Sequence, residues 1–262
     1  DHGAPSSVTG HLHRMQLNLT LKYLTLCTGH QRDAQRRKDI LAMGIRVVVA
    51  LTENESVGTA EMAMQLLANL VWQDQDTKVS VLMLTQMGKS LSDKLDGEKA
   101  LPGMVQQASR ALVSLWAEAP TVPEIPLAST TTPATAAPHS GEAGAAWHVA
   151  LQEYSLRGES MRQLRFPLTF AGEALQGKLH FSGTGQDPEA GGSDFTLAGE
   201  LDTATGQWAF TRRPTRGQQT TITYKGYSDK CGAWGTYSSP MGRQLRVFRV
   251  FKVAAPAVQE DE

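Results

Sequence analysis

The sequence predicts a helical N-terminal half followed by an antiparallel β domain. Up to about residue 118, apolar residues recur at helical spacing and glycine is sparse. From residue 119 to 146 the chain is rich in Pro, Ala, Thr and Ser, and such a segment cannot bury enough apolar surface to offset its ordering entropy. Beyond it, glycine is frequent and apolar residues alternate with polar ones, which is typical of strands.

These shifts in composition divide the chain into four segments. The 262 residues, 40% of them hydrophobic, are enough for one large or two small domains. We expect helical repeats over residues 1–118, a linker over 119–147, an antiparallel β domain over 148–254 and an acidic tail over 255–262. The chain begins with Asp1 rather than Met, so we expect a fragment or a processed product.

An internal repeat runs through the helical half. Residues 19–26, 63–70 and 108–115 share apolar side chains at their first, sixth and eighth positions. Their last residues, Leu26, Leu70 and Leu115, are 44 and 45 residues apart. That period lies within the roughly 40–47 residues of HEAT and armadillo units. The helical half is therefore predicted to stack about three units, each burying its apolar face on its neighbours.

The connecting segments strengthen this prediction. Residues 38–51 and 78–91 each contain a short helical pattern, a glycine and further apolar residues, with Gly44 and Gly88 as the glycines. Together with Leu67-Ala68-Asn69-Leu70, this pattern resembles the armadillo-repeat family over residues 11–117. The resemblance implies an α-solenoid whose third helices line a groove, where an Asn holds the backbone of an extended partner.

The resemblance also implies a set of partner-binding residues. Asn69 matches the groove Asn, whereas its counterparts are Thr25 and Ser114, and Gln65 stands where import receptors of the family have Trp. A nuclear-import groove is therefore not expected. We call Gln65, Asn69, Arg110 and Ser114 the predicted binding stripe, and the alternative is that they form a solvated helix face. For Trp72 and Trp116 the alternative is that they cover the end of a core. The predicted protein-binding residues are Gln65, Asn69, Trp72, Arg110, Ser114 and Trp116.

Seven strands are predicted in the second half. Turn signals separate them, and the short connections exclude a parallel sheet and favour a meander, closed as a barrel or folded as a small sandwich. The Gly232-Ala233-Trp234-Gly235 segment loosely resembles avidin-like and lipocalin-like meanders. A ligand cavity does not follow from this resemblance, because a barrel of this size could be filled by its own side chains. A deep, aromatic-lined cavity around Trp208, Tyr224 and Trp234 would support a ligand-binding role. The predicted strands cover residues 164–170, 177–182, 194–201, 207–212, 220–226, 231–237 and 244–253.

Basic residues dominate the end of the β domain. Between Arg212 and Lys252 the only acidic residue is Asp229. This asymmetry predicts a basic face for an acidic protein, RNA or anionic lipid, and the alternative is internal pairing with the acidic early strands. The formal net charge of −1 gives no global basic field, which disfavours nucleic acid as a partner. The predicted basic face consists of Arg212, Arg213, Arg216, Lys225, Arg246 and Arg249.

The sequence predicts no catalytic site, no metal site and no cofactor. It contains no Walker loop, no His-Glu-x-x-His and no Gly-x-Ser-x-Gly segment. Asp187, Glu189 and Asp194 lack the spacing of an EF-hand, so we expect a solvated loop there. Cys27 and Cys231 are far apart, which favours a reducing compartment and a cytoplasmic location. No apolar run approaches the roughly 20 residues of a membrane span.

The leading interpretation is a non-catalytic protein-interaction or scaffold protein, a subunit of a larger intracellular assembly. One alternative is a ligand-binding β-barrel localised by the helical repeats. Another is a fragment of a larger ubiquitin ligase, because several such ligases carry armadillo repeats.

Overall fold

The chain forms two compact units, Asp1–Ala119 and Pro120–Glu262, which are considered separately. The predicted linker, except for residues 146–147, and the predicted tail lie outside the described residues. The computed structural model describes residues 5–28, 34–72, 74–84, 87–95, 101–117, 146–155, 161–171, 177–216, 220–229, 232–240 and 242–253.

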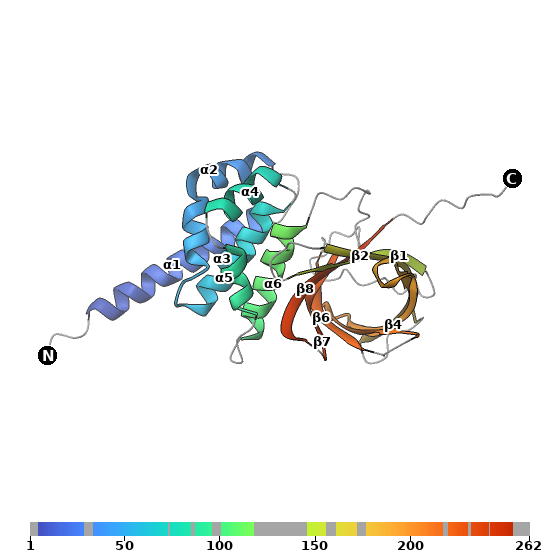
Figure 1. Cartoon of the computed structure of the whole chain (residues 1–262). Helices are drawn as coiled ribbons and strands as arrows, with labels where there is room; N and C mark the ends of the chain where they lie inside the picture. The colour runs from blue at the N-terminus through green and yellow to red at the C-terminus, as the bar shows by residue number, and fades with distance from the viewer. Residues whose placement is uncertain are drawn as a thin grey trace. The chain divides into compact units, whose positions relative to one another are not determined.

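The helical unit is built around α3. This helix packs against α1, α2 and α6, and nearly every residue from Ala63 to Val71 is buried, as a helix enclosed by others requires (Figure 1). None of the described helices is long and apolar enough to cross a membrane. The helices are α1 (Pro5–Thr28), α2 (Ala34–Leu51), α3 (Val57–Val71), α4 (Gln75–Leu84), α5 (Met87–Asp93) and α6 (Pro102–Trp116).

The three segments of the sequence repeat lie in α1, α3 and α6. These helices are neighbours in the order α1, α3, α6. Hydrogen bonds join positions about one repeat apart: Asn69 reaches Thr25, and Arg110 reaches the carbonyl of Gln65. Gly44 leaves helical geometry inside α2 with φ −162° and ψ 16°, so a kink at this glycine divides α2 into two helical segments.

The second unit contains a closed eight-stranded antiparallel barrel. Each strand pairs with the next along the chain, and β1 also pairs with β8 (Figure 1). The meander and its closure as a barrel are thus confirmed, and the sandwich alternative is wrong. The strands are β1 (Ala146–Tyr154), β2 (Met161–Phe170), β3 (Lys178–Asp187), β4 (Ser193–Asp202), β5 (Gln207–Pro214), β6 (Ile222–Asp229), β7 (Gly232–Ser239) and β8 (Gly242–Lys252), with a short 3-10 helix, η1 (Pro188–Ala190), after β3.

The strand missing from the sequence prediction is β1. Its inward positions are Trp147, Val149, Leu151 and Glu153, so a charged residue interrupts the apolar alternation. β1 closes the sheet, because it pairs with both β2 and β8 and so joins the two ends of the meander.

Aromatic rings fill the barrel interior. The Phe210 ring stacks on Tyr224 at 4.4 Å with an interplanar angle of 7°. Gly199 makes room for Phe210, since a Cβ added to this glycine would lie 2.3 Å from the Phe210 Cβ. Trp208 and Tyr224 belong to the interior cluster, whereas Trp234 lies out of phase with the interior residues of β7. These three residues therefore do not together line the aromatic cavity that would support the ligand-binding alternative.

Candidate functional site

Asn69 joins three helices of the helical unit. Its amide nitrogen donates to the Thr25 carbonyl at 3.1 Å and to the Thr28 hydroxyl at 3.3 Å, both on α1. Its amide oxygen accepts from the Arg110 guanidinium of α6 at 2.9 Å. The side chain is buried, so its hydrogen-bonding groups are used to hold α1, α3 and α6 together.

The other predicted protein-binding residues are divided between core and surface. Trp72 and Ser114 are buried, whereas Gln65, Arg110 and Trp116 are half-buried. The Trp116 ring lies against Gly88 of α5. The six residues therefore do not form one exposed stripe. Their role in binding stays a prediction, and burial favours the alternative that Trp72 covers the end of a core.

An exposed apolar stripe lies instead on α1. Its members are between 50% and 66% exposed, although all are large and hydrophobic. At about 100° per residue they fall within roughly 80° of the helix circumference, on the side opposite the buried Leu21. We call this set the outer α1 stripe; it consists of Leu12, Met15, Leu19, Tyr23 and Leu26.

Charge beside the outer α1 stripe has one sign. Lys22 is exposed at the edge of the stripe, Arg14 is exposed on the opposite side of the helix, and α1 contains no Asp or Glu. The helix segment from Gly10 to Gln16 is exposed on all sides, and in Figure 1 this half of α1 extends beyond the other helices of its unit. An isolated helical segment of this length is marginal in water, so contacts with another molecule would stabilise it.

A second candidate site is a buried group of charges at one end of the barrel. Because neighbouring strands run antiparallel, the last residues of β1, β3 and β5 meet the first residues of β2 and β6 at the same end. All five side chains lie at positions in phase with the barrel interior. We call this group the ionic cluster; its members are Glu153, Arg162, Asp187, Arg212 and Tyr224.

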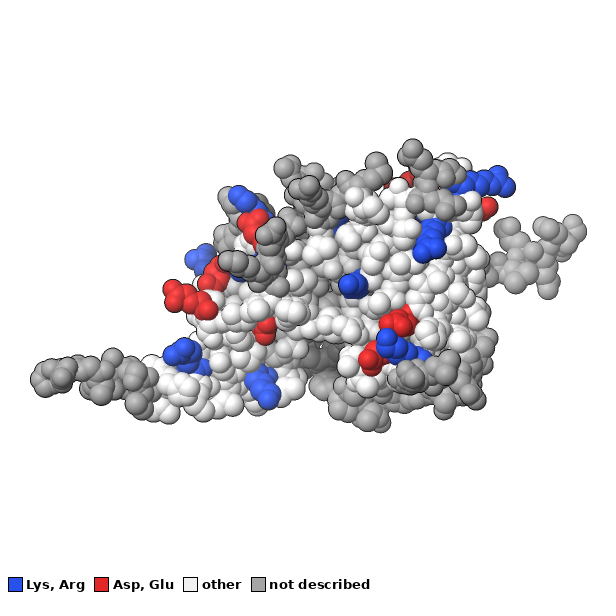
Figure 2. All heavy atoms as spheres, turned by 90° about the horizontal axis from the view of Figure 1, so that it is seen from below, with Lys and Arg blue, Asp and Glu red and all other residues white. Residues whose placement is uncertain are grey.

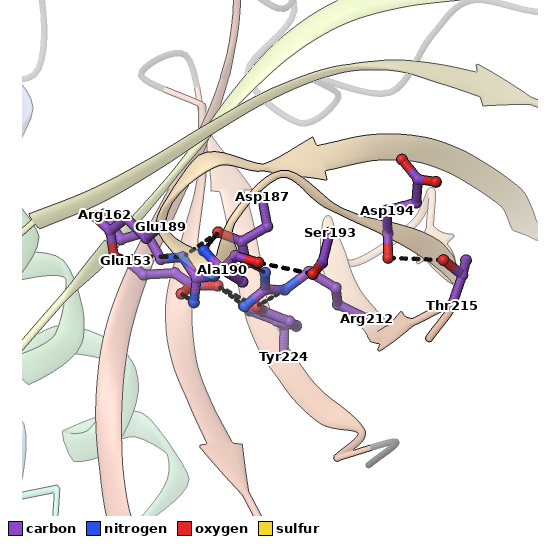
Figure 3. Close-up of polar contacts among 10 residues, drawn as sticks. All are labelled: Glu153, Arg162, Asp187, Glu189, Ala190, Ser193, Asp194, Arg212, Thr215 and Tyr224. Atoms are coloured by element: carbon purple, nitrogen blue, oxygen red, sulfur yellow. Dashed lines mark hydrogen bonds and ion pairs between the residues drawn. The ribbon is translucent and has the colours of Figure 1, made fainter. Parts of the chain in front are cut away.

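Arg212 lies at the centre of the ionic cluster (Figure 3). Its Nη2 is 2.9 Å from Glu153 Oε1, its Nη1 is 3.1 Å from Asp187 Oδ2, and its Nε donates to the Tyr224 hydroxyl at 3.0 Å. Arg162 forms an ion pair with Asp187 and lies 3.7 Å from Glu153 Oε2. Two buried carboxylates thus face two guanidinium groups, so the five members together are neutral, and the exposed Glu189 carboxylate lies 3.7 Å from Arg162 Nε at the rim of the cluster.

Tyr224 contributes a hydrogen-bond donor to the ionic cluster. Its hydroxyl donates to Glu153 Oε1. Burial raises the pKa of Tyr224 well above its usual value, and the neighbouring Glu153 carboxylate raises this pKa further while Arg212 opposes the shift. The phenol therefore keeps its proton at neutral pH and serves as a fixed donor. Every member of the cluster has a partner within it. We therefore interpret the cluster as a structural group that closes this end of the barrel.

The predicted basic face is not continuous. Arg212 and Arg249 are buried, whereas Arg213, Arg216, Lys225 and Arg246 are exposed. Arg212 pairs internally with Glu153 of β1 and Asp187 of β3, which was the alternative to a basic face. On the face drawn in Figure 2, the basic and acidic side chains of the described residues are scattered, and no large area carries one sign.

Sequence reasoning missed Glu153 and Arg162 and placed Asp187 in a solvated loop. The loop prediction is wrong for Asp187, because this carboxylate is buried and accepts from Arg162 and Arg212. A signal was present in the sequence: each of the charges continues the period-2 series of inward residues on its strand. A charge at such a position predicts a partner across the barrel.

Comparison with models of known protein families finds no match, and comparison with curated proteins finds none either.

Proposed function

We propose that this protein is a non-catalytic interaction protein, and that the outer α1 stripe docks an acidic amphipathic helix of a partner protein. The observation that supports this most is that α1 is apolar on two opposite sides. One side carries Leu21 and packs on α3, while the other carries the exposed outer stripe. Such a helix is typical of the interior of a helical assembly.

The spacing of the stripe favours a helix as the occupant. Leu12, Leu19 and Leu26 are seven residues apart, and Met15 follows Leu12 by three. This is the heptad spacing that forms a narrow seam between two helices. A helix that lies on a lipid surface typically presents a broader apolar face.

The charge beside the stripe favours a partner different from this chain. A second copy would bring Lys22 near the same lysine, with no acidic group of α1 to pair with it. An acidic partner helix would instead form ion pairs at the rim of the seam. The 44–45 residue repeat supports the further proposal that the unit is an armadillo-like stack, on which a partner helix would continue the order α1, α3, α6.

Site-directed photocrosslinking tests this proposal. A photoreactive phenylalanine analogue replaces Tyr23 in the full chain, and the crosslinked segment is identified by mass spectrometry. Leu19→Asp is the disruptive variant and Thr20→Asp, one residue off the stripe, is its matched control. Burial of a leucine contributes about 1.5–3 kcal/mol, so Leu19→Asp should weaken binding at least about tenfold.

Support requires a crosslink to an amphipathic helical segment with acidic flanks, together with loss of binding in Leu19→Asp and retention in Thr20→Asp. A crosslink to a second copy of the chain or to lipid would overturn the choice of partner. Equal binding by the two variants would overturn the role of the stripe.

A further inference from the structure

The pairing of β2 with β3 is incomplete, unlike the pairing of these strands with their other neighbours. β1 pairs with β2 from its first residue to Thr169, and β4 pairs with β3 along its whole length. β3, in contrast, pairs with β2 only over residues 168–170. Residues 161–167 of β2 and 184–187 of β3 therefore have no ladder partner on each other's strand. We call this stretch of the barrel wall the β2–β3 seam.

The ladder between β2 and β3 ends at a proline. The Ala171 N–H donates to the His180 carbonyl at 2.8 Å. In an antiparallel pair, alternate residues turn their backbone groups to the same neighbour, so Thr169 and Pro167 also turn theirs toward β3. Pro167 has no N–H, so it cannot donate to β3 at this position. Prolines within sheets are typical of strand edges, and β2 has the character of an edge on this side.

The Arg162 side chain crosses the seam in place of a ladder. Its Nε donates to Asp187 Oδ1 at 3.2 Å and lies 3.7 Å from Glu189 Oε2, and a second nitrogen forms an ion pair with Asp187 (Figure 3). Among the described residues, the hydrogen bonds and ion pairs between side chains of 161–167 and 184–192 all come from Arg162. This side chain is 25% exposed, so water can reach these bonds and replace them.

An aromatic contact on the inner side of the seam adds to this bond. A Cβ added to Gly185 would lie 2.9 Å from the Phe166 Cβ and 2.8 Å from the Phe195 ring, so β2 approaches β3 closely at this glycine. The rings of Phe166 and Phe195 meet edge to face, with their centroids 5.4 Å apart. Dispersion contacts of this kind weaken over a displacement of about 1 Å. The seam is therefore held by one ion-paired side chain and by apolar packing.

We propose that the barrel opens locally at the β2–β3 seam, and that Arg162 is the side chain that keeps the seam closed. In the open state residues 161–167 stay paired with β1 and move away from β3, because only the β1 side carries a ladder. Segments with few backbone hydrogen bonds open at a lower free energy than the rest of a structure. The opening exposes the inner side of β2, which carries Leu164 and Phe166. This inference concerns the barrel alone and does not depend on the role proposed for α1.

Native-state thiol labelling in the full chain measures opening at a chosen residue. Leu164→Cys places the reporter on the inner side of β2 within the seam. Leu201→Cys is the matched reporter on β4, where the same residue type is paired with both β3 and β5. Both leucines are 0% exposed, so a thiol at either position reacts only when the structure around it opens. Cys27 and Cys231 are replaced by Ser throughout.

The dependence on urea distinguishes local opening from global unfolding. Labelling at residue 164 should be faster than labelling at residue 201, and it should change little with urea below the unfolding transition, because a local opening exposes little surface. Labelling at residue 201 should rise steeply with urea. The proposal is overturned if the two reporters label at the same rate with the same urea dependence.

Three variants then test what holds the seam. Arg162→Met should speed labelling at residue 164 at least about tenfold, as the loss of a charge-assisted hydrogen bond would. Arg165→Met, on the exposed outer side of the same strand, is the control and should change it by no more than about twofold. Pro167→Thr supplies the missing N–H and should slow labelling. Equal effects of the two arginine variants would overturn the role of Arg162, and unchanged or faster labelling in Pro167→Thr would overturn the role of the proline.

Discussion

Replacing Arg212 by Met should destabilise the barrel far more than the same change at its neighbour Arg213. Arg212 is buried and contacts Glu153, Asp187 and Tyr224, whereas Arg213 is exposed on the same strand. The two substitutions remove the same charge from adjacent residues, so their difference isolates the contribution of burial and pairing. Methionine keeps much of the length of the arginine stem, which limits the cavity that the change creates.

The size of the effect follows from the geometry of the cluster. Without Arg212, two buried carboxylates share Arg162, and the cluster changes from neutral to a net charge of −1. Glu153 keeps the Tyr224 hydroxyl and an Arg162 nitrogen that is 3.7 Å away. Removing one partner from a buried ion pair typically costs about 3–5 kcal/mol, whereas an exposed substitution stays within about 0.5 kcal/mol.

Hydrogen–deuterium exchange with mass spectrometry measures this effect in the full chain. The method reports on β1, β3 and β5 separately from the helical unit, which is necessary because two units need not unfold as one. Protection in these strands should fall by about 3 kcal/mol or more in Arg212→Met. Protection in α3 should be unchanged.

A double variant distinguishes loss of charge balance from loss of packing. Combining Arg212→Met with Glu153→Gln leaves Asp187 paired with Arg162 and an amide oxygen that can still accept from Tyr224. Part of the lost stability, at least about 1 kcal/mol, should return. The reasoning is refuted if Arg212→Met costs no more than Arg213→Met, or if the second substitution only adds to the loss.

Three further predictions concern other contacts. Asn69→Ala should lower the stability of the helical unit by about 2–3 kcal/mol in urea unfolding, because it also leaves Arg110 without its amide acceptor, and a loss below about 0.5 kcal/mol would contradict this. Gly199→Ala should lower the melting temperature, since an added Cβ would lie 2.5 Å from the Ala209 carbonyl oxygen. The control is Gly10→Ala on α1, where a Cβ meets open space, and it should leave the melting temperature unchanged or raise it. The contribution of Tyr224 to barrel stability should be constant below about pH 10 and should fall above it. Above this pH the phenol ionises in the unfolded chain, whereas its raised pKa keeps it protonated in the folded barrel, so the unfolded state gains stability. Tyr224→Phe should make that fall less steep, and an unchanged slope would contradict the assignment.

Periodicity was sufficient to predict most of the fold. Residues 19–26, 63–70 and 108–115 were identified by spacing alone, and they lie in three neighbouring helices. Alternation identified seven of the eight strands, because inward residues such as Phe195, Leu197 and Trp208 are apolar. It failed for β1, where Glu153 occupies an inward position.

The polar contacts could not be read from the sequence, because their partners are distant along the chain. Asn69 matched a groove residue by local pattern, but its bonds to Thr25 and Arg110 span 44 and 41 residues. Glu153 and Tyr224 are 71 residues apart, yet the tyrosine hydroxyl is one of the partners that accommodate Glu153 in the interior. Local composition therefore could not distinguish a solvated charge from a buried, paired one.

At the ionic cluster, the charged groups of the barrel interior already satisfy one another, and this bears on what this end of the barrel can do. Glu153 and Asp187 are matched by Arg162 and Arg212, so an added ligand would have to break existing bonds. The cluster is therefore better suited to holding β1, β3 and β5 together than to binding a ligand.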